Sequence, residues 1–368
     1  ISKTAQAIMF LEQQQEKEEK LSKLYILRGS KPIEVPALNA GDIGAIAKME
    51  AKTGDSLATK SHPITYEAAR LSKPYTSKAY KAVNKGEVDK IAQGLARLNQ
   101  EDNTFKIVND PANRQTLIYG IGDQHIDVIV SKLQERYKVA VELDTPKVAF
   151  KETIRKKSDV ENKYKKQSGG HGQYGHVKMR FEPSDDMDKA FIFEEEVVGG
   201  SVPKNYFPAV EKGLADSVVA GPLAGYPVVG VKAVLYDGSY HPVDSSEMAF
   251  KTATSMAFKD GFMKAGPVLL EPIVTMKVTV PNDYTGDVMG DLNKRRGRVL
   301  GMDPIPGGKT CIVAEVPELE TAGYATQLRS MTGGAGDFEY EFCRDEQAPS
   351  DVQEKEIAAR AAMKDSEE

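Results

Sequence analysis

The chain has 368 residues and a net charge of −5, with 40% apolar and 28% charged residues. This composition is typical of a globular protein of two to four domains, and it excludes a uniformly basic coat while allowing a local basic face. Two cysteines are too few for a disulfide framework or a zinc ribbon, and no apolar run reaches the ~20 residues that cross a bilayer.

The first 66 residues predict short strands and turns. Residues 23–29 and 41–49 are strand-like, with glycines between them. The chain opens on Ile1 rather than on Met, so we expect it to be a fragment of a longer protein. The cysteine usage favours a reducing cytoplasm, and we expect no membrane partner.

Residues 67–145 predict a β-α-β-β-α-β unit, the split βαβ arrangement of ferredoxin-like domains. Strands are expected over 73–83, 105–110, 115–122 and 139–143, and helices over 86–102 and 124–137. The apolar spacing places one side of each helix in the core. The residues expected on these inward stripes are Val88, Ile91, Leu95 and Leu98, and Ile126, Ile129, Val130, Leu133 and Tyr137.

Residues 146–267 predict a mixed α+β domain that begins with a basic strand region. Strands follow over 191–199 and 226–240, and helices over 203–221 and 244–266. Asp237-Gly238 is a tight-turn signal, which would project the residues after it at a loop tip. Asp244 and Glu247 have the spacing of a helix N-cap and its reciprocal partner.

Residues 268–344 repeat the ferredoxin-like order without repeating its sequence. Strands are expected over 268–280, 298–305, 309–317 and 337–342, and helices over 285–297 and 322–332. The tail over 345–368 predicts a helix that starts near Ser350. The fold class is therefore multidomain α+β.

The segment "SGGHGQYGHV" at 168–177 raises the question of a phosphate or metal site. The chain contains no G-x-x-x-x-G-K-[S/T] motif, so we predict no binding of GTP or ATP by that route. His171 and His176 lie five residues apart across glycines, with His241 elsewhere and no ligand-spaced Cys or Glu, which argues against a metal. No nucleophile elbow is present, and we expect no catalytic residue.

Contact with RNA is better supported. Between Lys151 and Lys178 the chain carries eight basic residues against three acidic ones, and Tyr164 and Tyr174 lie among the lysines. Such interleaving can bind phosphates and stack on bases, although a solvated strand face explains the charge equally well. A second basic cluster, "NKRRGR" at 293–298, ends a helix, where a favourable contact with the helix dipole is the simpler explanation.

Several long segments resemble elongation factor G, the bacterial ribosomal translocase. They include "GIGDQHIDVIVSKLQERY", "QSGGHGQYGHVKMRFEP", "GGSVPKNYFPAVEKG", "DGSYHPVDSSEMAFK" and "GYATQLRSMTGG", in family order. The resemblance implies that 1–66 is the end of a β-barrel domain II, that 67–145 and 268–344 are the ferredoxin-like domains III and V, and that 146–267 is domain IV. It also implies that the guanine-nucleotide domain, with its GTP and Mg²⁺, lies outside this sequence.

The same resemblance implies a ribosomal site for domain IV, whose tip contacts the tRNA–mRNA duplex in the decoding site. The tip residues carried over are Ser168, Gly169, Gly170, His171, Gly172 and Gln173 on one loop, and Asp237, Gly238, Ser239, Tyr240 and His241 on the other. We interpret the glycines as allowing close approach to a crowded duplex. The basic residues expected on rRNA of both subunits, beside ribosomal proteins, are Lys156, Lys157, Lys163, Lys165, Lys166, Lys294, Arg295 and Arg296. The protein is expected to be a monomer.

Two departures from the family pattern leave alternatives open. His171 stands where relatives usually have Arg, and Pro242 where they usually have an acidic residue. A recycling or stress paralogue therefore remains an alternative, as does a tetracycline-resistance ribosomal protection protein. A free-standing enzyme using His171, His176 and His241 would require a metal.

Overall fold

The computed structural model describes residues 6–10, 16–20, 23–47, 49, 51, 53–59, 62–67, 69, 71–72, 74–111, 113–167 and 172–367. The chain divides into two compact units, residues 1–108 with 117–144, and residues 109–116 with 145–368. Each is described by itself, and the domain names introduced above are kept for the ranges given there.

Strands before residue 66 form two three-stranded sheets. Their pairing orders are β2-β1-β6 and β4-β3-β5, and both are antiparallel. The strands are β1 (Gln6–Phe10), β2 (Glu16–Lys20), β3 (Leu24–Arg28), β4 (Lys31–Val35), β5 (Ala45–Ile46) and β6 (Ser56–Ala58). Within the described part of this region no strand pairing joins the two sheets, so the partial barrel stays a prediction.

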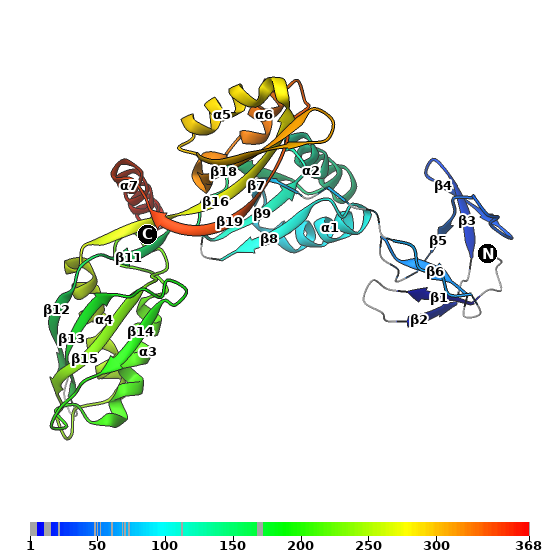
Figure 1. Ribbon diagram of the computed structural model, residues 1–368. Helices are drawn as coiled ribbons and strands as arrows, with labels where there is room; N and C mark the ends of the chain where they lie inside the picture. The colour runs from blue at the N-terminus through cyan, green and yellow to red at the C-terminus, as the bar shows by residue number, and fades with distance from the viewer. Residues whose placement is uncertain are drawn as a thin grey trace. The chain divides into compact units, whose positions relative to one another are not determined.

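Domain III has the expected β-α-β-β-α-β order (Figure 1). Its sheet has the order β10-β7-β9-β8, and its helices bury Ile91, Leu95, Leu98, Ile126, Ile129 and Leu133. Val88 was expected on the inward stripe but is 56% exposed, at the first residue of its helix. The elements are β7 (Thr76–Ala82), α1 (Val88–Glu101), β8 (Lys106–Asp110), β9 (Gln115–Gly120), α2 (Asp123–Tyr137) and β10 (Val141–Asp144).

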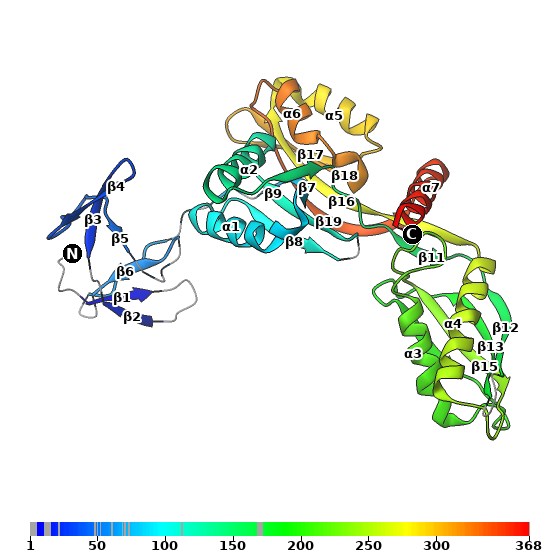
Figure 2. The same ribbon diagram turned by 180° about the vertical axis from the view of Figure 1, so that it is seen from behind.

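Domain IV is a four-stranded sheet with two helices on one face, as Figure 2 shows. The sheet order is β12-β13-β15-β14, in which only β14 and β15 are parallel. The strands of this sheet are β12 (Ser158–Lys166), β13 (Gln173–Pro183), β14 (Phe191–Glu195) and β15 (Val231–Ser239), and the helices are α3 (Phe207–Ser217) and α4 (Glu247–Lys264). The short strand β11 (Lys151–Ile154) precedes them and pairs with the sheet of the next domain. Phe181, Phe250, Phe258 and Phe262 lie in the core between sheet and helices.

Domain V repeats the ferredoxin-like order around one long strand, β16 (Pro267–Pro281). That strand pairs with β18 (Lys309–Pro317), β19 (Asp337–Gln347) and the short β11. The remaining elements are α5 (Thr285–Lys294), β17 (Arg298–Ile305), α6 (Tyr324–Met331) and the C-terminal α7 (Ser350–Glu367). The multidomain α+β fold class is therefore confirmed.

Two local predictions in domain IV are wrong. Asp237 and Gly238 do not make a turn but continue β15, where they pair with Lys178 and Val177 of β13. The N-cap of α4 is Ser246, whose hydroxyl accepts the N–H of Ala249, whereas Asp244 stands two residues earlier.

Within the described residues, every helix is too short or too polar to traverse a lipid bilayer.

Candidate nucleic-acid interface

The start of β13 and the segment that leads from β15 into α4 meet at one end of domain IV (Figure 1). The Asp244 carboxylate accepts the backbone N–H of Gly172 at 2.9 Å, and its carbonyl accepts the N–H of Tyr174 at 2.8 Å. The Ser245 hydroxyl donates to the Tyr174 carbonyl at 2.9 Å. These three bonds, which we call the tip clasp, fasten the 240–246 loop to the start of β13.

His241 lies on this clasp with its orientation set by the backbone. Its N–H donates to the Ser245 hydroxyl at 2.8 Å, and its Nδ1 accepts the N–H groups of Asp244 at 3.0 Å and Val243 at 3.3 Å. Because Nδ1 accepts, the ring proton of the neutral imidazole lies on Nε2. The side chain is 49% exposed, so a donor is available to a partner at this tip.

His176 is in a different position, beneath the tip and 8% exposed. Its Nδ1 lies 2.6 Å from the Ser239 hydroxyl and its Nε2 lies 2.9 Å from the Glu161 carboxylate. The Tyr174 hydroxyl is 2.7 Å from the same serine, so a hydrogen-bonded chain crosses three neighbouring strands. Both ring nitrogens are occupied within the domain, which makes His176 part of the support of the tip.

Two glycines of the tip region are required by packing inside the domain. A Cβ on Gly175 would lie 2.4 Å from the Ala249 carbonyl oxygen in the first turn of α4. A Cβ on Gly238 would lie 2.3 Å from the His176 carbonyl oxygen on β13 and 2.6 Å from Val202. Both distances are shorter than Cβ contacts in proteins, so these positions need glycine whatever the tip binds.

A row of lysines follows β12, the edge strand of the sheet, toward the same tip. Lys163, Lys165 and Lys166 are exposed, and none makes an ion pair with a described residue. The Lys163 ammonium lies 5.0 Å from the centre of the Tyr174 ring. Burial alone would raise the pKa of Tyr174, but the Ser239 hydrogen bond and the two nearest lysines hold that pKa below its ordinary value.

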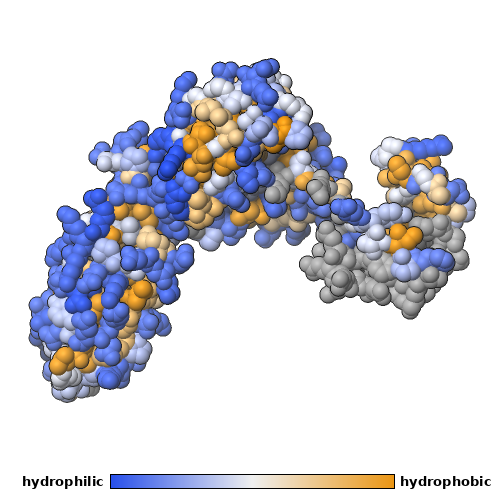
Figure 3. Space-filling view, in the orientation of Figure 1, coloured by the Kyte–Doolittle hydropathy of each residue, from blue (hydrophilic) through white to orange (hydrophobic). Residues whose placement is uncertain are grey.

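Other charges on the same sheet are paired. Lys178 lies 2.9 Å from Asp237, and this bond, with the N–H of Gly238, lowers the pKa of Asp237 to about 2. Lys157 lies 3.5 Å from Glu182, whereas Lys156 is exposed and has no ion pair within the described part of the chain. The domain IV surface in Figure 3 is mostly hydrophilic, with a few apolar residues among the charges.

The second basic cluster is divided between surface and interior. Lys294 is exposed at the end of α5. Arg295 contacts Asp291 at 2.9 Å and lies over the ring of Tyr324, and Arg296 binds both oxygens of the buried Glu271 at 2.7 and 2.9 Å. The two arginines thus stabilise domain V internally, and their contact with rRNA stays a prediction.

The structure therefore brings together only part of the predicted tip. Ser168, Gly169, Gly170 and His171 lie outside the described residues. Gly172, Gln173, Ser239, Tyr240 and His241 lie in or beside the two loops, and the Gln173 side chain accepts a hydrogen bond from Tyr164 at 3.0 Å. Sequence reasoning missed Asp244, Ser245 and Glu161, because their partners are about 15 or more residues away along the chain.

Cofactor chemistry finds no support among the residues that the structure describes. No cluster of three His, Cys, Asp or Glu side chains could hold a metal ion there. The expectation that GTP and Mg²⁺ bind outside this sequence stays a prediction.

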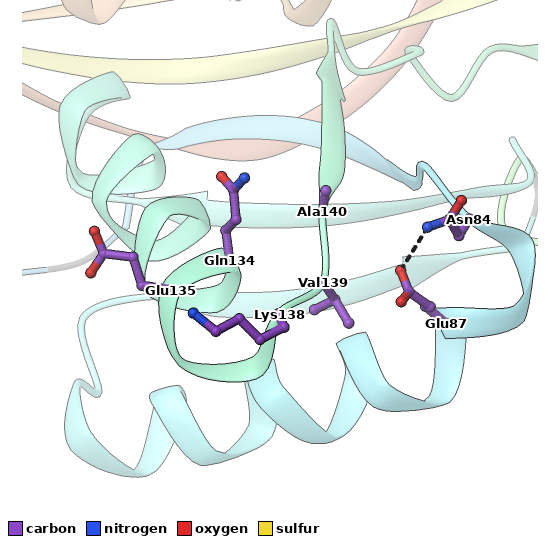
Figure 4. Close-up of a pocket in the computed structure, with 7 residues that line it drawn as sticks. All are labelled: Asn84, Glu87, Gln134, Glu135, Lys138, Val139 and Ala140. Atoms are coloured by element: carbon purple, nitrogen blue, oxygen red, sulfur yellow. Dashed lines mark hydrogen bonds between the residues drawn. The ribbon is translucent and has the colours of Figure 1, made fainter.

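An open pocket of about 460 Å³ lies in domain III at the end of α2 (Figure 4). Its lining residues are Asn84, Glu87, Gln134, Glu135, Lys138, Val139 and Ala140, and the Asn84 amide donates to Glu87 at 3.2 Å. Two carboxylates and one ammonium do not form a convergent set of donors for an anion, and we assign it no ligand.

Comparison with known families gives three matches in chain order. Residues 71–145 match "Elongation Factor G, domain III", residues 146–280 match "Elongation factor G, domain IV", and residues 268–356 match "Elongation factor G C-terminus". A crystal structure of a protein from Thermus thermophilus superposes with a TM-score of 0.82 at 36% identity. The match covers 98% of this chain and 54% of that one, so the chain spans about half the length of that protein.

Proposed function

The chain belongs to the elongation factor G family, and we propose that it acts on the ribosome in the GTP-dependent translocation of tRNA and mRNA, with the domain IV tip in the decoding site. Membership of this family identifies the chain as part of a translation factor. The finer role is the proposal, and it rests on the tip described above.

The observation that carries it is the coincidence of hydrogen-bonded tip residues with unpaired positive charge. The tip clasp holds the loop that carries Tyr240 and His241 against Gly172 and Tyr174, and the lysines of β12 lead to the same end. Backbone N–H groups, a histidine donor and lysines can bind phosphates and 2′-hydroxyls without reading base sequence. A factor that moves every codon needs contacts of this kind.

The partners follow from the family. We propose contacts with rRNA of both subunits, with ribosomal proteins and with the tRNA–mRNA duplex, made by a monomer in the cytoplasm. GTP and Mg²⁺ would bind to the guanine-nucleotide domain of the family and not to the residues described above. This chain would then have no catalytic residue.

The test is the salt dependence of binding to purified ribosomes. Each phosphate contacted lowers the slope of log affinity against log salt by roughly 0.7–0.9, so replacing Lys163, Lys165 and Lys166 by Gln should remove up to about 2–3 units of slope. The matched control replaces Lys178 and Lys232, whose ammonium groups are already paired at 2.9 and 2.8 Å. The control should change the slope by less than about one unit.

This assignment would be contradicted if the protein did not bind ribosomes at low salt. It would also be contradicted if both sets of lysine replacements changed the salt slope equally. Toeprinting with the natural full-length factor follows the mRNA directly. Ribosome splitting, or release of bound tetracycline, without mRNA movement would instead favour the recycling paralogue or the ribosomal protection protein.

A further inference from the structure

A buried carboxylate lies where domain IV joins domain V, at the end of domain IV opposite the tip (Figure 1). Glu152 is 0% exposed, and no described lysine, arginine or histidine pairs with it. Its oxygens accept the backbone N–H groups of Leu223 at 2.9 Å, Ala224 at 2.7 Å and Tyr226 at 3.0 Å. A buried carboxyl group with only backbone donors is costly, and its burial raises the pKa of Glu152 despite those hydrogen bonds.

The loop that it binds is folded around it. The N–H of Gly221 donates to the Tyr226 carbonyl at 2.7 Å, and a Cβ on Gly221 would lie 2.1 Å from a Glu152 carboxylate oxygen. The Glu152 backbone also bonds this segment, through its N–H to Pro227 and its carbonyl to Val229, each at 2.9 Å. The 221–226 loop, which follows α3 of domain IV, is thus fixed to β11 by both backbone and side chain.

On its other side β11 belongs to domain V. Glu152 pairs with Leu269 of β16, and the N–H of Leu269 donates to the Gln353 side chain of α7 at 3.0 Å. Tyr226 completes the connection, because its hydroxyl donates to Glu356 of α7 and the Arg360 guanidinium lies 4.1 Å from its ring centre. Burial and the Glu356 hydrogen bond both raise the pKa of the Tyr226 phenol.

The chain crosses between domains IV and V at two adjacent strands, β11 and β16. Two paired strands alone leave a hinge, since rotation about their common direction breaks few contacts. A third attachment away from that direction would block the rotation. The 221–226 loop and α7 supply such an attachment, around a small apolar cluster that includes Phe150, Ala224, Tyr226, Leu269 and Ala348.

The geometry points to Glu152 and Tyr226 as positioning residues that anchor domain IV to domain V and α7, so that the two domains move as one body. The inference does not rest on the proposed function, because the anchor holds domain IV whatever its tip contacts.

The test measures the distance distribution between the two domains in the full chain without ribosomes. Nitroxide labels are placed on Asp185→Cys in domain IV and Asp283→Cys in domain V, both exposed, with Cys311 and Cys343 replaced by Ser. Glu152→Gln keeps the side-chain volume but replaces one carboxylate oxygen by an NH₂ group. That donor would face the backbone N–H groups of the 221–226 loop, and the hydrogen bonds to that oxygen would be lost. The distribution should widen at least twofold, and amide exchange at 223–226 should accelerate at least tenfold.

The matched control is Glu195→Gln, an exposed carboxylate on β14, which should change neither measurement. Tyr226→Phe removes only the hydroxyl contact with Glu356 and provides a second variant if Glu152→Gln does not fold. Widening in either variant, with exchange of the β13 amides unchanged, supports the anchor. An unchanged distribution in every folded variant overturns it.

Discussion

Replacing Gly238 by Ala distinguishes a packing role of this glycine from a direct role in contact with RNA. The added Cβ would lie 2.3 Å from the His176 carbonyl oxygen, whereas Cβ contacts under 3.0 Å are essentially never seen. Strands β13 and β15 would have to separate by about 0.7 Å or more, and the obstructing atom is backbone, which cannot rotate away. Overpacking of this kind costs about 1–3 kcal/mol, and we expect the upper half of that range.

Hydrogen exchange followed by mass spectrometry measures that cost within domain IV alone. A loss of about 2 kcal/mol corresponds to roughly 30-fold faster exchange of the β13 and β15 amides. The matched control is Gly290→Ala in α5, where no atom lies within 4 Å of the new Cβ and where helix propensity favours Ala by about 0.8–1.0 kcal/mol. A Gly238→Ala protein that exchanges like the wild type but no longer binds ribosomes would refute the packing argument and favour direct contact.

Three further outcomes are expected. Gly175→Ala should detach the first turn of α4, because its Cβ would lie 2.4 Å from the Ala249 oxygen, and exchange should accelerate over 247–252. Glu271→Gln should lower the unfolding temperature of domain V in calorimetry, since it breaks a two-bond pair with Arg296 on a buried carboxylate, at a cost on the order of 3 kcal/mol. Asp237 should titrate in carboxyl ¹³C NMR with a midpoint near its pKa of about 2: its folded pKa is depressed, so the stability that it contributes is present above pH 3.8 and is lost as the pH falls toward 2. A midpoint near 3.8 would show that the Asp237 pair does not hold in solution.

Sequence patterns predicted domains III and V closely because their signals are local. Each helix carries an apolar stripe with a period near 3.6, and each strand pair is bounded by turn residues. The stripe of α1 held for Ile91, Leu95 and Leu98 but not for Val88, which periodicity places inward although it is exposed at the first residue of the helix. Periodicity fixes a face of a helix and does not fix how far the covered surface extends.

The domain IV tip was less predictable because its decisive contacts are non-local. Asp237-Gly238 has the letters of a turn, yet pairing with β13 keeps these residues in a strand. The glycine is needed because another backbone lies against it, which no local rule reveals. Asp244 likewise resembles an N-cap, but its carboxylate binds Gly172, which is 72 residues away. Local propensity therefore placed the turn after β15 too early and misassigned the reason for these residues.

Three carboxylates near the tip of this acidic chain are already engaged by neighbouring groups. Asp244 accepts a backbone N–H, Asp237 forms an ion pair with Lys178, and the Glu161 carboxylate is hydrogen-bonded to the His176 ring. Lys163, Lys165 and Lys166 of β12 have no carboxylate partner among the described residues, so unpaired positive charge lies near the tip although the net charge of the chain is −5. The same bonds order the loops during folding, when each residue fixed costs about 1–2 kcal/mol of conformational entropy. A partner that meets the tip afterwards does not have to bear that cost, which raises its affinity without any additional contact.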